Sequence, residues 1–93
     1  MKIFETVDGN GRKIYLTDER WSHIQRHENI VNIFDRITET LSKPTKIYFL
    51  EEDPRSYFYF RYYKDLKQYL KIIVSYLNGE GFIVTVYYTR NLK

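Results

Sequence analysis

The chain of 93 residues has a formal net charge of +3, no cysteine and 18% aromatic side chains, including ten tyrosines. This length fits one folded domain, residues 1–93, and the lack of cysteine excludes a disulfide framework and a thiolate metal site. No apolar stretch approaches the roughly 20 residues that cross a bilayer, and the first residues do not resemble a signal peptide. We therefore expect a cytoplasmic protein without membrane contact.

The first part of the chain predicts a β-hairpin followed by a helix. Residues 2–6 and 13–16 read as short strands, and the Asp8-Gly9-Asn10-Gly11 segment between them has the residue types of a tight turn. Thr17 is a candidate N-cap, and the two acidic residues after it favour the first turn of a helix. This helix is predicted to run to about residue 27 or 28.

A second helix is predicted between Asn29, another candidate N-cap, and Pro44. The residue before a proline avoids the α region, so the helix should end there. Its apolar residues recur at helical spacing and form one stripe: Ile30, Ile33, Phe34, Ile37 and Leu41.

The remaining sequence predicts four strands, at residues 46–50, 56–64, 69–77 and 82–89, with short hairpin-length connections between the last three. We therefore expect an α+β fold in which the N-terminal hairpin and two helices pack on a four-stranded antiparallel sheet.

The alternation of side chains along a strand predicts one apolar and one polar face for each strand. In the last strand, the apolar face would consist of Phe82, Val84, Val86 and Tyr88. The polar faces are expected to assemble into one concave surface that carries Tyr59, Arg61, Lys71, Thr85 and Tyr87.

Basic residues gather in the second half of the chain. From residue 61 onward, six Lys and Arg face two acidic residues, whereas residues 1–60 carry nine basic and ten acidic residues. Basic residues interleaved with tyrosines suit RNA, although lysines that protect a strand edge are the alternative interpretation. The predicted RNA-binding residues are Tyr57, Tyr59, Tyr63, Lys64 and Arg90.

His23 and His27 are four residues apart and project from one side of the predicted helix. Either imidazole could act as an acid or base near neutral pH, and a packing or capping role is the alternative. Zinc would need further ligands, so we expect no metal and no cofactor. For RNA cleavage by transesterification, Arg61 and Lys71 suit the phosphate and Tyr87 suits proton donation.

The order of several segments resembles one nuclease superfamily. These are Arg20-Trp21-Ser22-His23-Ile24 with His27, a helix that ends before Pro44, and the closing Thr85-Val86-Tyr87. The order is similar to that of the superfamily of barnase, EndoU, colicin-type tRNases and RelE toxins, in particular its small phage- and prokaryote-associated branch. The resemblance implies helices on a four-stranded antiparallel sheet and metal-independent RNA cleavage. It also implies site roles for His23, Thr85 and Tyr87, and for Arg61 or Lys71.

We therefore predict a small metal-independent endoribonuclease that acts on mRNA or tRNA. The resemblance further implies a toxin with an antitoxin or inhibitor protein as its partner. Two alternatives stay open: a non-catalytic RNA-binding module, and a protein-interaction domain that uses the tyrosine-rich sheet face. The choice between the two histidines also stays open.

Overall fold

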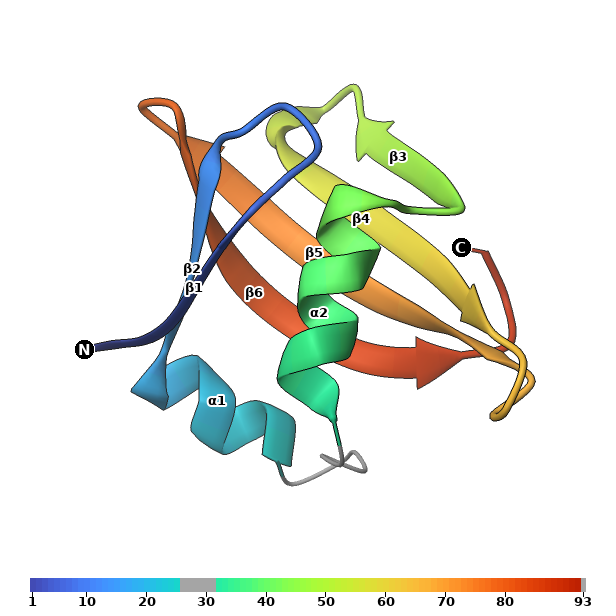
Figure 1. Cartoon of the computed structure of the whole chain (residues 1–93). Coiled ribbons are helices and arrows are strands. Elements are labelled where there is room, and N and C mark those ends of the chain that lie inside the picture. The colour runs from blue at the N-terminus through green and yellow to red at the C-terminus, as the bar shows by residue number, and fades with distance from the viewer. Residues whose placement is uncertain (26–31, 93) are drawn as a thin grey trace.

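The computed structural model describes residues 1–25 and 32–92, which form six strands and two helices (Figure 1). The hairpin and the later strands lie close to their predicted positions. Neither helix in the described residues is long and apolar enough to cross a membrane. In chain order the elements are β1 (Lys2–Val7), β2 (Lys13–Thr17), α1 (Asp18–Gln25), α2 (Ile33–Ser42), β3 (Lys46–Leu50), β4 (Asp53–Tyr63), β5 (Gln68–Leu77) and β6 (Glu80–Thr89).

All six strands belong to one mixed sheet, in the order β1-β2-β6-β5-β4-β3. Neighbouring strands are antiparallel except β2 and β6, which run parallel and pair Ile14 with Gly81 and Tyr15 with Phe82. The expected four-stranded antiparallel sheet is therefore wrong. The prediction fails because the N-terminal hairpin extends the sheet through β2 instead of packing on it beside the helices.

The junction between β2 and β6 depends on the missing side chain of Gly81. A Cβ atom at this position would lie 2.8 Å from Cγ1 of Val74, 3.0 Å from Cε1 of Tyr76 and 3.2 Å from Cγ1 of Ile14. Such contacts are too close for a real side chain, so glycine permits the close approach of the two strands.

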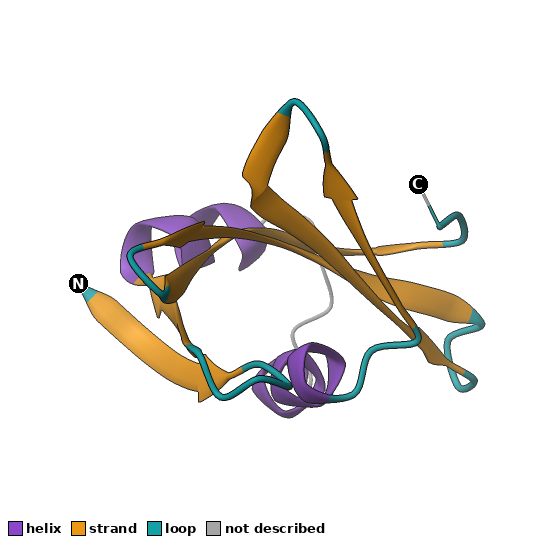
Figure 2. Ribbon diagram, turned by 90° about the horizontal axis from the view of Figure 1, so that it is seen from above, coloured by secondary structure: helices purple, strands orange, loops and turns teal. Residues whose placement is uncertain are grey.

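The sheet curves around α2, which lies along its concave side (Figure 2). We call the face toward α2 the inner face and the opposite one the outer face. Helix α2 packs on β1, β4 and β5, while α1 lies beside β2 and β6 at one end of the sheet. The apolar core between helices and sheet includes Ile24, Ile33, Ile37, Leu41, Leu70, Ile72 and Val74.

The described part of α2 begins at Ile33 and ends at Ser42, just before Pro44 as predicted. At the C-terminal end of the helix, the backbone N–H of Lys43 donates a hydrogen bond to the carbonyl of Glu39. The predicted N-cap Asn29, the stripe residue Ile30 and the predicted end of the first helix lie outside the described residues.

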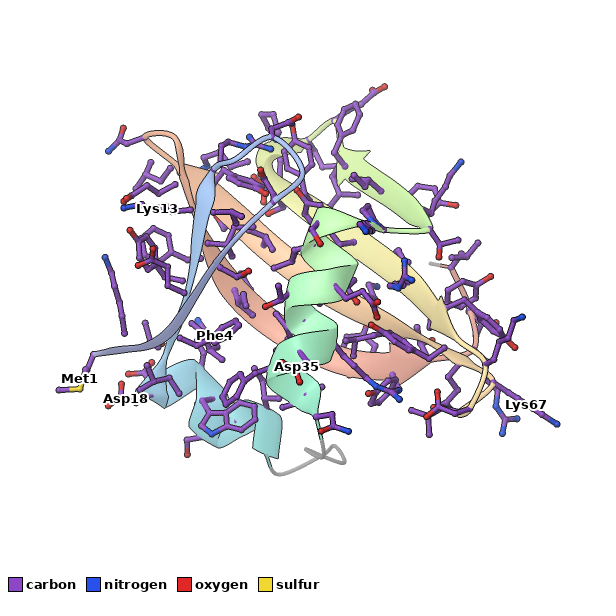
Figure 3. All side chains as sticks on the ribbon, viewed as in Figure 1. Met1, Phe4, Lys13, Asp18, Asp35 and Lys67 are labelled. Carbon is purple, nitrogen blue, oxygen red and sulfur yellow. The ribbon has the colours of Figure 1, made fainter. Side chains whose placement is uncertain are left out.

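Phe34 was expected in the buried stripe of this helix, but it is 36% exposed. Its ring instead stacks on Phe4 of β1 at a centroid distance of 4.7 Å and lies tilted against Trp21 of α1 at 4.8 Å. This aromatic group joins both helices to the N-terminal hairpin at the rim of the core (Figure 3 labels Phe4).

The strict alternation predicted for the last strand is broken by an irregularity. Ile73 of β5 pairs with Thr85, but the next residue, Val74, pairs with Ile83, so Val84 is an extra residue in β6. As a result Ile83 and Val86 are buried in the core. The expected apolar face of Phe82, Val84, Val86 and Tyr88 is therefore wrong for its first two residues.

Candidate nucleic-acid interface

The five residues predicted to form one concave surface lie on both faces of the sheet. The inner face, toward α2 and the core, carries two of them, Tyr59 and Arg61, together with the predicted RNA-binding residues Tyr57 and Tyr63. The outer face carries the other three: Lys71, Thr85 and Tyr87. The expected single surface is therefore wrong, because α2 and the core fill the concave side of the sheet.

Tyr59 belongs to a buried polar network rather than to a surface. Tyr76 donates a hydrogen bond to Oδ2 of Asp8 at 2.8 Å, and its oxygen lies 2.6 Å from that of Tyr59. Since Tyr76 has one hydroxyl hydrogen, Tyr59 must donate to it. Asp8, which is 4% exposed, also accepts from the backbone N–H groups of Asn10 and Arg12 and from Nε of Arg12.

The ionisation of these groups follows from their surroundings. Burial favours a raised pKa for Asp8, but hydrogen bonds from Tyr76, Arg12 and Asn10 outweigh it and lower the pKa below the ordinary 3.8. Burial raises the pKa of Tyr76, and its hydrogen bonds to Tyr59 and Asp8 raise it further. The network therefore holds a carboxylate and two neutral tyrosines, and it fastens the β1–β2 turn to β4 and β5.

Arg61 and Tyr63 bind α2 to β4. Nη1 of Arg61 donates to the carbonyl of Lys43 at 2.6 Å, and its Nε lies 3.3 Å from Oε1 of Glu39. The hydroxyl of Tyr63 donates to the same carboxylate at 2.7 Å. Burial, followed by this bond, raises the pKa of Tyr63 to about 12, so the phenol is neutral at physiological pH. Both side chains therefore have structural partners at the end of the helix.

Lys71 lies on the outer face with only 5% of its surface exposed. Its Nζ is 4.7 Å from the ring centroid of Phe58 and 5.4 Å from those of Phe60 and Tyr87. No salt bridge to Lys71 is found among the described residues. The negative faces of the three rings stabilise the ammonium group in place of a carboxylate.

A continuous path of aromatic rings crosses the outer face from β3 to the far ends of β4 and β5. Tyr48 contacts Phe60 edge to face at 5.7 Å, Phe60 contacts Tyr69 at 6.2 Å, and Tyr69 contacts Tyr62 at 5.2 Å. Phe60 is fully buried beneath its neighbours, whereas Tyr48 is 38% and Tyr62 42% exposed. The exposed rings offer apolar faces to solvent at both ends of the path.

The Tyr62 end of this path is basic. Lys64 and Lys67 lie in the turn between β4 and β5, and Arg90 follows β6, whose last residues pair with the start of β5. All three are exposed, and Figure 3 shows Lys67 extending away from the turn. Among the described residues none of them forms a salt bridge, and the nearby Asp65 is bound by Arg36 at 2.7 Å. This end therefore combines positive charge with the exposed ring of Tyr62.

Sequence reasoning thus selected Lys64 and Arg90 but missed Tyr48, Tyr62 and Tyr69. It placed Tyr62 with Phe58 and Phe60 on the apolar face of β4 and took the opposite face as the surface, although both faces of β4 are aromatic. The missing information was which buried acceptors the tyrosine hydroxyls of the inner face would have. Asp8 accepts from Tyr76, which accepts from Tyr59, and Glu39 accepts from Tyr63. A signal was present in the turn, since an aspartate that opens Asp8-Gly9-Asn10-Gly11 is a recurrent backbone acceptor.

His23 is exposed on α1, which packs beside β2 and β6. His27 lies outside the described residues. Within residues 1–25 and 32–92, no three potential ligands are grouped so as to hold a metal ion.

Comparison of the chain with protein-family models, with curated proteins and with solved structures found no match. The nuclease resemblance inferred from short motifs therefore stays a prediction, and the geometry of the outer face is what supports a function.

Proposed function

We propose that the outer face of the sheet binds single-stranded RNA, beginning at the end that carries Tyr62 and Tyr69. The observation that carries this proposal is the exposed ring of Tyr62, paired with the half-buried ring of Tyr69, beside three cations that form no salt bridge within the described residues: Lys64, Lys67 and Arg90. Rings stack on unpaired bases, and cations attract the backbone between them.

The geometry favours a single strand over a duplex. In an RNA duplex the bases are stacked on one another inside the helix, and their faces are not available to side chains. The path from Tyr62 through Tyr69 to Tyr48 is long and exposed at its two ends, which suits an extended chain with bases stacked at intervals.

The first test is binding of a fluorescent single-stranded oligoribonucleotide, measured by anisotropy at several salt concentrations. Replacing Tyr62→Ala removes a stacking ring and is expected to weaken binding by about 1–3 kcal/mol. The matched control is Tyr62→Phe, which retains the ring and should bind like the wild type. Equal affinity of the alanine variant and the wild type would contradict the proposal.

The cationic end has a separate test in the salt dependence. The triple variant Lys64→Ala, Lys67→Ala, Arg90→Ala should bind more weakly at low salt. Each phosphate contact of a single strand contributes about 0.7 to the slope of log affinity against log salt, so three lost contacts flatten the slope by about 2. An unchanged slope would place the phosphate contacts elsewhere.

Cleavage of the bound strand is a second candidate function, favoured by the grouping of Lys71, Thr85 and Tyr87 on the same face. Lys71 and Tyr87 are cross-strand partners, and Thr85 is two residues before Tyr87. The hydroxyl groups of Thr85 and Tyr87 are suited to donate hydrogen bonds to a phosphorane and to protonate a leaving 5′-oxygen, while a base takes the 2′-hydroxyl proton. The buried ammonium group of Lys71 adds positive charge next to the Tyr87 ring. Arg61 is not included, because Lys43 and Glu39 already bind it.

Incubation with RNA in EDTA tests this candidate. Metal-independent cleavage with 2′,3′-cyclic phosphate ends is expected from the wild type and should be lost in Tyr87→Phe. The variant His23→Ala then determines whether this histidine supplies the base. If the protein binds RNA and no cleavage product forms, the non-catalytic RNA-binding function is supported. The endonuclease activity, and the toxin role that depends on it, are then excluded.

A further inference from the structure

Strand β3 ends the sheet with one free edge and an unusually apolar sequence. Four consecutive residues, Ile47, Tyr48, Phe49 and Leu50, are 45%, 38%, 62% and 37% exposed. The unpaired N–H and C=O groups of such an edge, flanked by apolar side chains, are a template for another strand.

The opposite edge of the sheet, β1, is different. Its central residue, Glu5, is charged and exposed. Charges within an edge strand oppose strand addition, and β3 has none between Ile47 and Leu50. Of the two edges, only β3 therefore has the composition of an interface.

The apolar side chains of β3 border a hollow of about 320 Å³. Its lining is entirely apolar or aromatic: Tyr48, Phe49, Leu50, Phe58 and Leu92. Figure 2 shows that the turn between β3 and β4 projects from the rest of the molecule. An added strand could therefore bury side chains here as well as pair its backbone.

The charges at the two ends of β3 identify the partner. Lys46 begins the strand, whereas Glu51 and Glu52 follow it, and none of the three forms a salt bridge with the described residues. In an antiparallel pair of identical strands, the start of one lies beside the end of the other. Lys46 of each copy would then meet Glu51 and Glu52 of the other copy, whereas parallel pairing would bring like charges together.

We propose that β3 pairs antiparallel with β3 of a second copy of this chain. The two six-stranded sheets become one continuous sheet with a two-fold axis near Phe49, which is an isologous interface. This inference does not depend on RNA, because the interface uses the strand edge and is tested in the absence of nucleic acid.

The first experiment is sedimentation equilibrium of the full chain without RNA, over a range of concentrations. The wild type is expected to be a dimer at high micromolar concentration. Phe49→Glu places a charge at the centre of the interface and should give a monomer with an unchanged circular dichroism spectrum. The control Ile3→Glu changes the other edge, and should leave the dimer intact. A monomeric wild type, or dissociation by the control alone, would overturn the proposal.

A charge exchange tests the antiparallel arrangement. Lys46→Glu is expected to raise the dimer dissociation constant about tenfold, since the two-fold axis repeats the change at both ends. The pair Glu51→Lys, Glu52→Lys should have the same effect by removing the partners of Lys46. All three changes together should restore the wild-type constant. Failure of this restoration while the single changes are disruptive would overturn the antiparallel β3 pairing.

Discussion

Replacing Tyr76 with phenylalanine removes one oxygen atom from the interior of the protein. That hydroxyl donates to Asp8 at 2.8 Å and lies 2.6 Å from the hydroxyl of Tyr59. A hydrogen bond to a charged group contributes about 1.5–3 kcal/mol, and the buried Tyr59 hydroxyl left without its acceptor costs about 1 kcal/mol more. We therefore expect Tyr76→Phe to lower the free energy of unfolding by about 2.5–4 kcal/mol, a large part of the 5–15 kcal/mol that is typical of a domain.

Urea unfolding followed by circular dichroism measures this change. Tyr62→Phe is the matched control, because Tyr62 is 42% exposed and its hydroxyl makes no hydrogen bond within the described residues. Its free energy of unfolding should stay within about 0.5 kcal/mol of the wild type. Equal stability of the Tyr76 and Tyr62 variants would refute the view that the buried network stabilises the fold.

The loss of stability in Tyr76→Phe is expected to depend on pH. The pKa of Asp8 is lower in the folded protein than its ordinary 3.8, so the unfolded chain binds the proton at higher pH than the folded protein. The carboxylate therefore stabilises the fold above pH 3.8, and this contribution is lost as the pH falls through the lower, folded pKa. Because Tyr76→Phe removes one of the bonds that lower this pKa, its deficit should be largest at neutral pH and shrink in acid.

Two further substitutions test the sheet and the helix contacts by the same unfolding assay. Gly81→Ala should lower the free energy of unfolding by about 1–3 kcal/mol, because the new Cβ lies 2.8 Å from Val74; Gly9→Ala, with its nearest contact at 3.4 Å, is the tolerated control. Arg61→Met should cost about 1–3 kcal/mol by leaving the carbonyl of Lys43 without its donor, and Arg61→Lys should restore little, since a lysine lacks the planar fork. If Gly81→Ala or Arg61→Met were as stable as the wild type, the contact assigned to that residue would be contradicted.

Much of the local structure could be predicted because it depends on neighbours in sequence. The turn at Asp8-Gly9-Asn10-Gly11 and the end of α2 before Pro44 follow from backbone preferences alone. The alternation along β4 was also correct in grouping Tyr57, Tyr59 and Arg61 on one face. The alternation of side chains along a strand, however, indicates which residues share a face and not which of the two faces is buried.

The buried face of β4 was set by partners that are distant in sequence. Tyr59 is satisfied through Tyr76 and Asp8, and Arg61 by the carbonyl of Lys43. A tyrosine or an arginine can face the core when such partners exist. The turn sequence marks Asp8 as an acceptor, but the sequence does not reveal which distant side chains donate to it. The same limit applies to β2, whose parallel pairing with β6 has no local signature.

That pairing has a consequence for how the chain folds. Ile14 of β2 and its partner Gly81 of β6 lie 67 positions apart in the sequence. Closing so large a loop is entropically costly, and contacts of this kind slow folding relative to the hairpins of β3 to β6. During synthesis the edge of β2 that pairs with β6 remains unpaired until β6 has left the ribosome. The hairpin is therefore expected to dock last, and in the meantime to be the segment most exposed to mispairing with other chains.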